Sequence, residues 1–377
     1  MFERPQGGDR ALLVALDFGD ADPAERMAEL EALALSAGAD VVGKVTGRRQ
    51  RPDAATFAGK GKVQQISATR DETGAELVIF DHPLSGAQQR NLERALECRV
   101  VDRTSLILDI FALRARSAEG KLQVELAQVK HQLTRLVGGW THLERQKGGI
   151  GLRGPGETQL ETDRRLLGDR VRVLRERLSH VERQRATQGR TRRRAAVRTV
   201  ALVGYTNAGK STLFNRLTRA KTYAADQLFA TLDTTLRRIY VPGAEPIVLS
   251  DTVGFIRELP HDLVAAFRAT LAEASQADLM LHVIDAGHPN RDEQASAVDA
   301  VLHEIGAEHV PQIRVMNKID LAGLDAGIAR DESGILCAVR VSALTGDGCA
   351  ELRAALAERF PADAQNSNAR IAPVLDA

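Results

Sequence analysis

The chain has 377 residues, of which 44% are apolar, so it exceeds one ordinary domain and can bury more than one core. No stretch approaches the roughly 18 consecutive apolar residues of a membrane-spanning helix, residues 1–8 lack the layout of a signal peptide, and the three isolated cysteines form neither a metal pattern nor a disulfide framework. The formal net charge is only +1, and the composition indicates a cytoplasmic protein of several domains without an integral membrane segment.

Residues 1–113 alternate between apolar runs and segments with helical periodicity. We expect strands at residues 11–16, 40–46, 77–81 and 99–101, and helices at residues 23–37, 63–72 and 86–97. Strands that alternate with helices in this way predict a small parallel α/β domain.

The segment from Gly59 to Lys62 (Gly-Lys-Gly-Lys) precedes one of these helices. Glycine followed by lysine can bind a phosphate, but the rest of a phosphate-binding loop is missing. A contact with an RNA backbone or a simple helix start is therefore favoured over a second nucleotide site.

Residues 114–196 carry two helical seams separated by a glycine-rich segment. Apolar residues step by four and three in both seams, at Leu122, Leu126, Val129, Leu133 and Leu136 and at Leu167, Val171, Leu174, Leu178 and Val181. This spacing is typical of coiled-coil packing, and the glycines between residues 138 and 156 exclude a continuous helix. We expect an antiparallel helical hairpin with a long loop at its tip, joined to the next domain by residues 190–194.

The same middle region holds all the excess positive charge. Residues 114–198 carry 21 basic and 9 acidic side chains, a net charge of +12, whereas residues 1–113 carry −4 and residues 199–360 carry −6. Eighteen of the 21 basic residues are arginine, which contacts phosphate in a bidentate manner. A charged helix is commonly only a solvated face, but this excess favours a polyanionic partner. We expect the loop to order on RNA through Arg145, Lys147 and Arg153.

Residues 197–360 begin with a phosphate-binding loop. An apolar run at residues 197–203 predicts a buried strand, and Thr212 opens the body of a helix. Between them, residues 204–211 match the pattern G-x-x-x-x-G-K-[ST], in which backbone N–H groups and the helix N-terminus bind phosphates. We expect Lys210 to bridge the β- and γ-phosphates and the Ser211 hydroxyl to bind Mg²⁺.

Two later segments decide which base is bound. Residues 317–320 follow a strand-like run, and the carboxylate of Asp320 can accept hydrogen bonds from N1–H and the 2-amino group of guanine. Adenine offers neither donor, so the carboxylate would lose its partners at a cost of about 1–3 kcal/mol. Residues 342–344 can supply a backbone N–H to guanine O6. Together the two segments indicate specificity for guanine.

Two further segments are suited to Mg²⁺ and the γ-phosphate. Asp251 ends the apolar strand at residues 247–250 and can hold Mg²⁺ through water, and the N–H of Gly254 can contact the γ-phosphate. Thr231 offers a hydroxyl to Mg²⁺ from the first switch. The expected catalytic residues are Lys210, Thr231 and Gly254, and the expected metal ligands are Ser211, Thr231 and Asp251.

Each segment alone occurs in solvated loops, but five in this order and spacing indicate a Mg²⁺-dependent GTP-binding domain with a doubly wound sheet. We place the domains at residues 1–113, 114–196 and 197–360, with a disordered polar tail at residues 361–377. The residues expected to contact the nucleotide are Gly204, Tyr205, Thr206, Asn207, Ala208, Gly209, Lys210, Ser211, Thr212, Phe229, Ala230, Thr231, Leu232, Asp233, Asp251, Thr252, Val253, Gly254, Asn317, Lys318, Ile319, Asp320, Ser342, Ala343 and Leu344.

Longer segments of the chain resemble the HflX family of GTPases. They are residues 229–233 (Phe-Ala-Thr-Leu-Asp), which form the first switch, residues 251–260 (Asp-Thr-Val-Gly-Phe-Ile-Arg-Glu-Leu-Pro), which form the second switch, the glycine-rich residues 148–161, residues 102–111 and residues 59–62. The resemblance covers about residues 10–360. It implies a Mg²⁺-dependent enzyme that hydrolyses GTP to GDP and phosphate, binds the large ribosomal subunit and its RNA, and splits or rescues stalled ribosomes. We expect the free protein to be a monomer.

Two positions depart from common patterns. Thr234 stands where the family has proline after the first-switch aspartate. Phe255 stands where many GTPases have a glutamine that orients the attacking water, which predicts slow hydrolysis by the free protein.

Three other functions stay open on the sequence. They are a ribosome-assembly GTPase, an NTP-driven RNA remodelling enzyme that uses the N-terminal domain, and a signalling adaptor with a protein partner. ATP turnover that survives loss of Lys210 would point to the second function. Partner binding that survives loss of the basic middle region would point to the third.

Overall fold

The computed structural model of the chain describes residues 8–19, 22–136, 155–194, 197–220, 227–257 and 273–362. The chain forms two compact units, the first made of Met1–Val181, Asp226–Ala230 and Leu259–Phe267 and the second of the remaining residues. Arg145, Lys147 and Arg153 of the glycine-rich loop, the end of the second switch at residues 258–260 and the tail from residue 363 lie outside the described residues.

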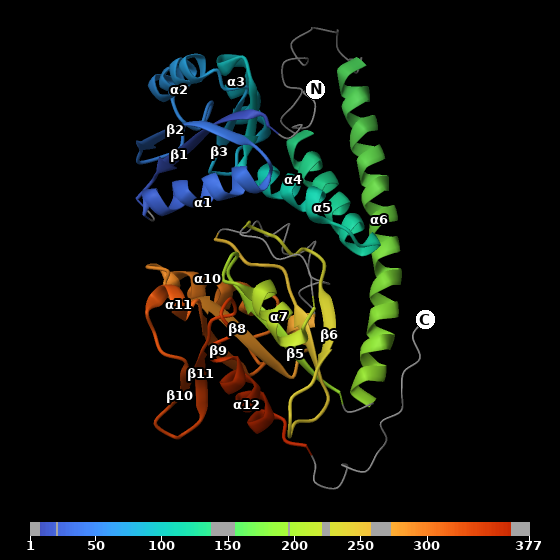
Figure 1. Cartoon of the computed structure of the whole chain (residues 1–377). Helices are drawn as coiled ribbons and strands as arrows, with labels where there is room; N and C mark the ends of the chain where they lie inside the picture. The colour runs from blue at the N-terminus through green and yellow to red at the C-terminus, as the bar shows by residue number, and fades with distance from the viewer. Residues whose placement is uncertain are drawn as a thin grey trace. The chain divides into compact units, whose positions relative to one another are not determined.

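The first unit contains a four-stranded parallel sheet with the strand order β2-β1-β3-β4, shown in blue tones in Figure 1. Its strands are β1 (Arg10–Asp17), β2 (Asp40–Arg48), β3 (Leu77–Phe80) and β4 (Arg99–Asp102). All side chains from Ala11 to Leu16 are buried, as expected of a parallel strand with helices on both faces. The predicted strands are confirmed to within two residues at each end.

Helices α2 (Lys60–Thr73) and α3 (Gly86–Leu96) share one apolar cluster with β1, whereas α1 (Pro23–Ser36) packs against β1 and α4 (Arg103–Arg114). Helix α4 was not predicted from the sequence. It follows β4 with no intervening loop, because Asp102 ends the strand and its side chain also caps the helix by accepting the Ser105 N–H (2.9 Å).

Two long helices, α5 (Ala118–Leu136) and α6 (Pro155–Arg194), follow in the chain. The predicted seams meet in one apolar cluster, made by Leu126 and Val129 of α5 with Val171, Leu174 and Leu178 of α6. Residues 190–194, predicted as a linker, are instead the last turns of α6. Four of these five residues are arginine, which is a good helix former, so the helix continues through them.

The second unit is built on a seven-stranded sheet with the order β10-β11-β9-β8-β5-β7-β6. The strands are β5 (Arg198–Gly204), β6 (Thr235–Ile239), β7 (Ile247–Asp251), β8 (Leu279–Asp285), β9 (Gln312–Asn317), β10 (Gly327–Arg330) and β11 (Leu336–Arg340). Only β6 and β10, at the two edges, run antiparallel to their neighbours. This is the predicted doubly wound GTPase architecture.

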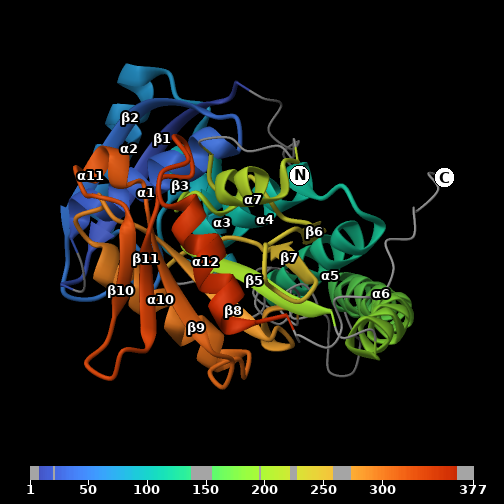
Figure 2. The ribbon, with the colours of Figure 1, turned by 60° about the horizontal axis from the view of Figure 1, so that its bottom comes forward.

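Figure 2 shows helices α7 (Lys210–Thr218) and α12 (Cys349–Arg359) together over one part of this sheet, and their apolar side chains share a cluster with β5, β7 and β8. Helix α10 (Arg291–Glu304) contacts β8 and β5. The segments after β5, β7 and β9 all leave the carboxyl edge of the sheet, where ligands bind in doubly wound folds. Within the described ranges, no helix is both long and apolar enough to cross a bilayer.

Candidate functional site

The phosphate-binding loop connects the end of β5 to the start of α7. Lys210 is buried, and its Nζ donates hydrogen bonds to the carbonyl oxygens of Gly204 (3.0 Å) and Tyr205 (2.7 Å). Burial lowers the pKa of Lys210 to about 8, and the carboxylate of Asp251 acts in the opposite direction. The loop therefore holds a cationic side chain beside the N-terminus of a helix, an arrangement suited to a phosphate.

Three oxygen-bearing side chains from separate segments converge next to the loop. The Ser211 hydroxyl donates to Oδ2 of Asp251 (2.7 Å) and lies 2.7 Å from the Thr231 hydroxyl, which itself donates to the same Oδ2 (3.1 Å). Asp251 is 1% exposed, and within the described part of the chain its Oδ1 accepts no hydrogen bond. Burial raises the pKa of Asp251, while the Ser211 hydrogen bond and the Lys210 charge oppose this. An unpaired carboxylate oxygen beside two hydroxyls matches the ligands that Mg²⁺ prefers.

The second switch lies directly against the phosphate-binding loop. The N–H of Phe255 donates to the carbonyl oxygen of Gly204 (3.1 Å), and the N–H of Thr206 donates to that of Phe255 (2.7 Å). A Cβ atom on Gly254 would lie 3.0 Å from Lys210 Nζ and 2.8 Å from Thr206 Cγ2, so only glycine allows this approach. The Phe255 ring is buried. It is a core side chain of the domain.

Asn317 joins the base-reading segments to the phosphate-binding loop. Its Nδ2 donates to the carbonyl oxygen of Ala208 (2.8 Å), and its Oδ1 accepts the N–H of Ala343 (2.9 Å). The Lys318 ammonium forms an ion pair with Asp285 (2.7 Å). The carboxylate of Asp320 is exposed, so it is available to a base. These contacts connect residues 317–320 and 342–344 to the phosphate-binding loop.

Two residues that contact these segments were not predicted from the sequence. Asp285 ends β8, and its position at the carboxyl edge of a predicted strand was the available signal. Arg216 lies on α7, and its side chain donates to the carbonyl oxygens of Ala343 (3.1 Å) and Leu344. No local pattern marks Arg216, because its acceptors lie more than a hundred residues away in the chain.

The predicted contact residues fall into distinct environments. Those at or beside the converging loops include Ser211, Thr231, Asp251, Gly254 and Asn317, as described above. Several others are buried, and the Thr252 hydroxyl donates to the Leu202 carbonyl (2.6 Å). The buried ones include Tyr205, Thr206, Ala208, Lys210, Leu232, Thr252, Val253, Ile319, Ser342 and Ala343. Leu344 is 71% exposed. Phe229 belongs to the first unit, where its ring packs against Phe111.

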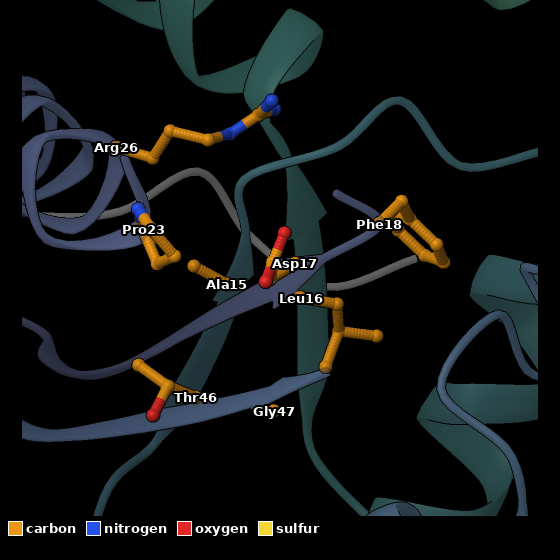
Figure 3. Close-up of a pocket in the computed structure, with 8 residues that line it drawn as sticks. All are labelled: Ala15, Leu16, Asp17, Phe18, Pro23, Arg26, Thr46 and Gly47. Atoms are coloured by element: carbon orange, nitrogen blue, oxygen red, sulfur yellow. The ribbon is translucent and has the colours of Figure 1, made fainter. Parts of the chain in front are cut away.

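The N-terminal sheet carries a small pocket at the carboxyl ends of β1 and β2, shown in Figure 3. It is lined by Ala15, Leu16, Asp17, Phe18, Pro23, Arg26, Thr46 and Gly47. Arg26 is bound to the buried Asp81 (2.9 Å), and the nearby Lys62 donates to the Thr46 carbonyl (2.8 Å). Helix α2 begins at Lys60, so the segment from Gly59 to Lys62 is a helix start.

Family models account for most of the chain. Residues 24–112 match a GTP-binding GTPase N-terminal domain, residues 114–193 match a GTP-binding GTPase middle region, and residues 199–318 match a 50S ribosome-binding GTPase.

Relatives align with most of the chain. The chain is 56% identical to the GTPase HflX of Escherichia coli K12 over 374 residues, which is 99% of this chain and 88% of that protein. It is 50% identical to the GTPase HflX of Caldanaerobacter subterraneus subsp. tengcongensis over 321 residues, 85% of this chain and 75% of the relative. The crystal structure of SsGBP in complex with GDP has the same fold, with a TM-score of 0.52 and 24% identity over 93% of this chain and 98% of that one. Because it matches these relatives over most of its length and carries a phosphate-binding loop in a doubly wound domain, the chain belongs to the HflX family of GTPases.

Proposed function

We propose that this GTPase holds Mg²⁺ through Ser211, Thr231 and Asp251 and reads guanine through Asp320. The buried, unpaired Oδ1 of Asp251 beside two hydroxyls supports the metal assignment. When bound, Mg²⁺ neutralises charge on the β- and γ-phosphates. Lys210 would bind the same phosphates with its ammonium group, and the N–H of Gly254 would contact the γ-phosphate.

The partner we propose is the large ribosomal subunit, and exposed arginines on α6 carry this proposal. Arg164, Arg165, Arg172 and Arg175 are exposed. At about 100° per residue they fall within about one third of the helix circumference, and about 16 Å separates the first from the last along the axis. Arg164, Arg165 and Arg175 form no ion pair with any residue that the structure describes. Three guanidinium groups without a described carboxylate partner, on one side of a helix, are suited to RNA phosphates.

Arg164, Arg165 and Arg175 differ in this respect from the charged residues of an ordinary solvated helix. A solvated helix commonly balances its charges with carboxylates three or four residues away, as Arg172 does with Asp169 (3.5 Å) and Glu176 (3.8 Å). The family-model description of residues 199–318 as a 50S ribosome-binding GTPase supports the same partner. We also propose that the protein splits or rescues stalled ribosomes in the cytoplasm. Its functional domains in this proposal are residues 1–113, 114–196 and 197–360.

Co-sedimentation with purified large subunits tests the proposal. The triple variant Arg164→Gln, Arg165→Gln, Arg175→Gln should bind subunits more weakly in the presence of a non-hydrolysable GTP analogue. The slope of log affinity against log salt should fall by about two to three. GTP binding by the free variant should not change, because none of the three arginines is among the residues expected to contact the nucleotide.

A matched control removes three exposed arginines elsewhere, at Arg48, Arg237 and Arg238. It loses the same net charge, so a specific role for α6 requires the control to bind as the parent does. Equal loss in both variants would reduce the effect to overall charge. Unchanged binding of the α6 variant across the salt series would contradict the proposed RNA contact.

A further inference from the structure

The loop that follows β11 is expected to supply a backbone N–H to guanine O6, and the structure shows which N–H is left for this contact. The N–H of Ser342 donates to the carbonyl oxygen of Asp347 (2.8 Å), and the N–H of Ala343 donates to Oδ1 of Asn317 (2.9 Å). The N–H of Leu344 donates to no residue in the part of the chain that the structure describes. Leu344 is 71% exposed, so a ligand can reach this group.

The side chain of Arg216 fixes the direction of this N–H. Its Nε donates to the carbonyl oxygen of Ala343 (3.1 Å), and its guanidinium group also donates to the carbonyl oxygen of Leu344. Because a trans peptide group is planar, its carbonyl oxygen and the N–H of the following residue point in opposite directions. The bond to the Ala343 carbonyl therefore holds the N–H of Leu344 so that it points away from Arg216. A Cβ atom on Gly346 would lie 3.5 Å from Arg216 Cζ, so the guanidinium group also packs against the loop.

Arg216 connects this loop to the helix of the phosphate-binding loop. Helix α7 begins at Lys210, and Arg216 lies in its last turn. Both residues and the loop after β11 belong to the second unit. At 1.5 Å per residue, about 9 Å of helix separates the two basic residues along the axis. One short helix thus carries the proposed phosphate contact at its start and the contact with the loop near its end.

We propose that Arg216 is a positioning residue for guanine recognition, which orients the Leu344 N–H toward O6 of the base. In this role Arg216 acts through the loop and not on the base itself. Adenine carries an amino group at position 6, so an N–H held in this direction opposes adenine as well as favouring guanine. The inference rests on the guanine site proposed above, which includes Asp320.

The test compares nucleotides that differ at position 6 of the base, using the full chain with Arg216→Met. GDP and inosine diphosphate both carry O6, whereas 6-thioguanosine diphosphate carries a sulfur atom, which is a weaker hydrogen-bond acceptor. We expect the affinities for GDP and inosine diphosphate to fall by about fivefold, and the affinity for the thio analogue to fall by less than about twofold. The preference for GDP over the thio analogue is the decisive readout, because a general loss of structure would lower all three affinities alike.

Arg353→Met is the matched control. Arg353 lies on α12 and also binds two backbone carbonyl oxygens, those of Tyr240 (2.8 Å) and Leu217 (2.7 Å). The substitution therefore removes the same charge and the same kind of contact, next to Arg216 in the chain but not from the loop after β11. This variant should keep the parent's preference for GDP over the thio analogue. A similar loss of that preference in both variants would overturn the role of Arg216.

The variant Asp320→Asn separates failure of this inference from failure of the guanine site. If Asp320→Asn leaves the GDP affinity unchanged, the proposed guanine site is wrong and the inference falls with it. If Asp320→Asn weakens GDP binding while Arg216→Met keeps the parent's preference for GDP over the thio analogue, only the positioning role is overturned. Equal loss of affinity for all three nucleotides in Arg216→Met would also overturn it, because the effect would then not involve position 6.

Discussion

The side-chain amide of Asn317 donates to the carbonyl oxygen of Ala208 at 2.8 Å, which joins the strand that precedes the base-reading segment to the middle of the phosphate-binding loop. The same side chain accepts the N–H of Ala343 at 2.9 Å. Asn317 is 1% exposed, so both of its partners are buried polar groups that depend on it.

Asn317→Ala should therefore weaken GTP and GDP binding to a similar extent. The substitution leaves two buried backbone groups without partners, at a cost of about 1–3 kcal/mol for each. Nucleotide titrations and urea unfolding of the free protein measure both effects. Asn91→Ala, which removes an exposed amide bound to the Ala55 carbonyl, is the control. Loss of GTP affinity alone would show that Asn317 acts on the γ-phosphate instead.

Asp320→Asn should weaken GTP binding by more than about tenfold, because an amide presents a donor where guanine already donates. Xanthine carries a carbonyl in place of the 2-amino group, so xanthosine triphosphate should regain part of the lost affinity. The exposed neighbour Asp325→Asn provides a matched control. Unchanged GTP affinity in Asp320→Asn would mean that another segment reads the base.

Gly254→Ala should impair the triphosphate state more than the diphosphate state. The added methyl group would lie 3.0 Å from Lys210 Nζ and 2.8 Å from Thr206 Cγ2, where the loop and the second switch meet. We expect GTP hydrolysis to fall by more than about tenfold, with GDP affinity retained. Gly287→Ala, whose methyl group would meet its nearest neighbour at 3.7 Å, is the control. Normal turnover by Gly254→Ala would place the γ-phosphate away from Gly254.

Phe255→Leu should keep most of the turnover, because the buried ring cannot hydrogen-bond a water molecule and acts as a core side chain. Phe255→Gln also should not abolish turnover, but an amide buried at this position should destabilise the domain by about 1–3 kcal/mol.

Lys210→Ala and Thr231→Ala should abolish GTP turnover. Steady-state hydrolysis by the parent should rise by about tenfold or more with large subunits, because we expect the subunit to order the switches. A free enzyme that is fast and indifferent to subunits would show that its site is complete alone.

We expect the folded protein to lose stability in acid because of the buried side chain of His282. It is buried in β8, and burial lowers its pKa from 6.5 to about 4, with Asp299 opposing this and Arg314 and Lys210 adding to it. The unfolded chain takes up the proton below pH 6.5 and the folded chain only near pH 4. Stability therefore falls as the pH drops through this interval, by about 2 kcal/mol at pH 5.

Urea unfolding at pH 7.5 and pH 5 checks this loss of stability. His282→Leu should remove that part of the acid sensitivity, whereas His303→Leu, at a histidine whose side chain is 80% exposed, should not. Equal acid sensitivity in the parent and His282→Leu would show that other groups cause it.

Local sequence patterns were sufficient to predict the phosphate-binding loop and the packing faces of the long helices. The loop from Gly204 to Ser211 needs only neighbouring residues of the right type, since its glycines and the following helix create the phosphate site by themselves. The seams of α5 and α6 were also readable, because helical periodicity places every third or fourth apolar residue on one face. By contrast, α4 was missed because the residue that caps it also ends a strand.

Contacts between distant residues were decided only by the tertiary structure. Periodicity tells which side of an element is buried but not which other element covers it, so nothing local indicated that Asn317 would bond to Ala208 or that Ser36 would accept the N–H of Leu228. The first switch shows this most clearly. Its sequence predicted Thr231 as a metal ligand, whereas the packing of Phe229 on Phe111 depends on a side chain more than a hundred residues earlier in the chain. Such pairs form because burial of apolar surface is non-directional, and the choice of partner follows from how whole elements pack.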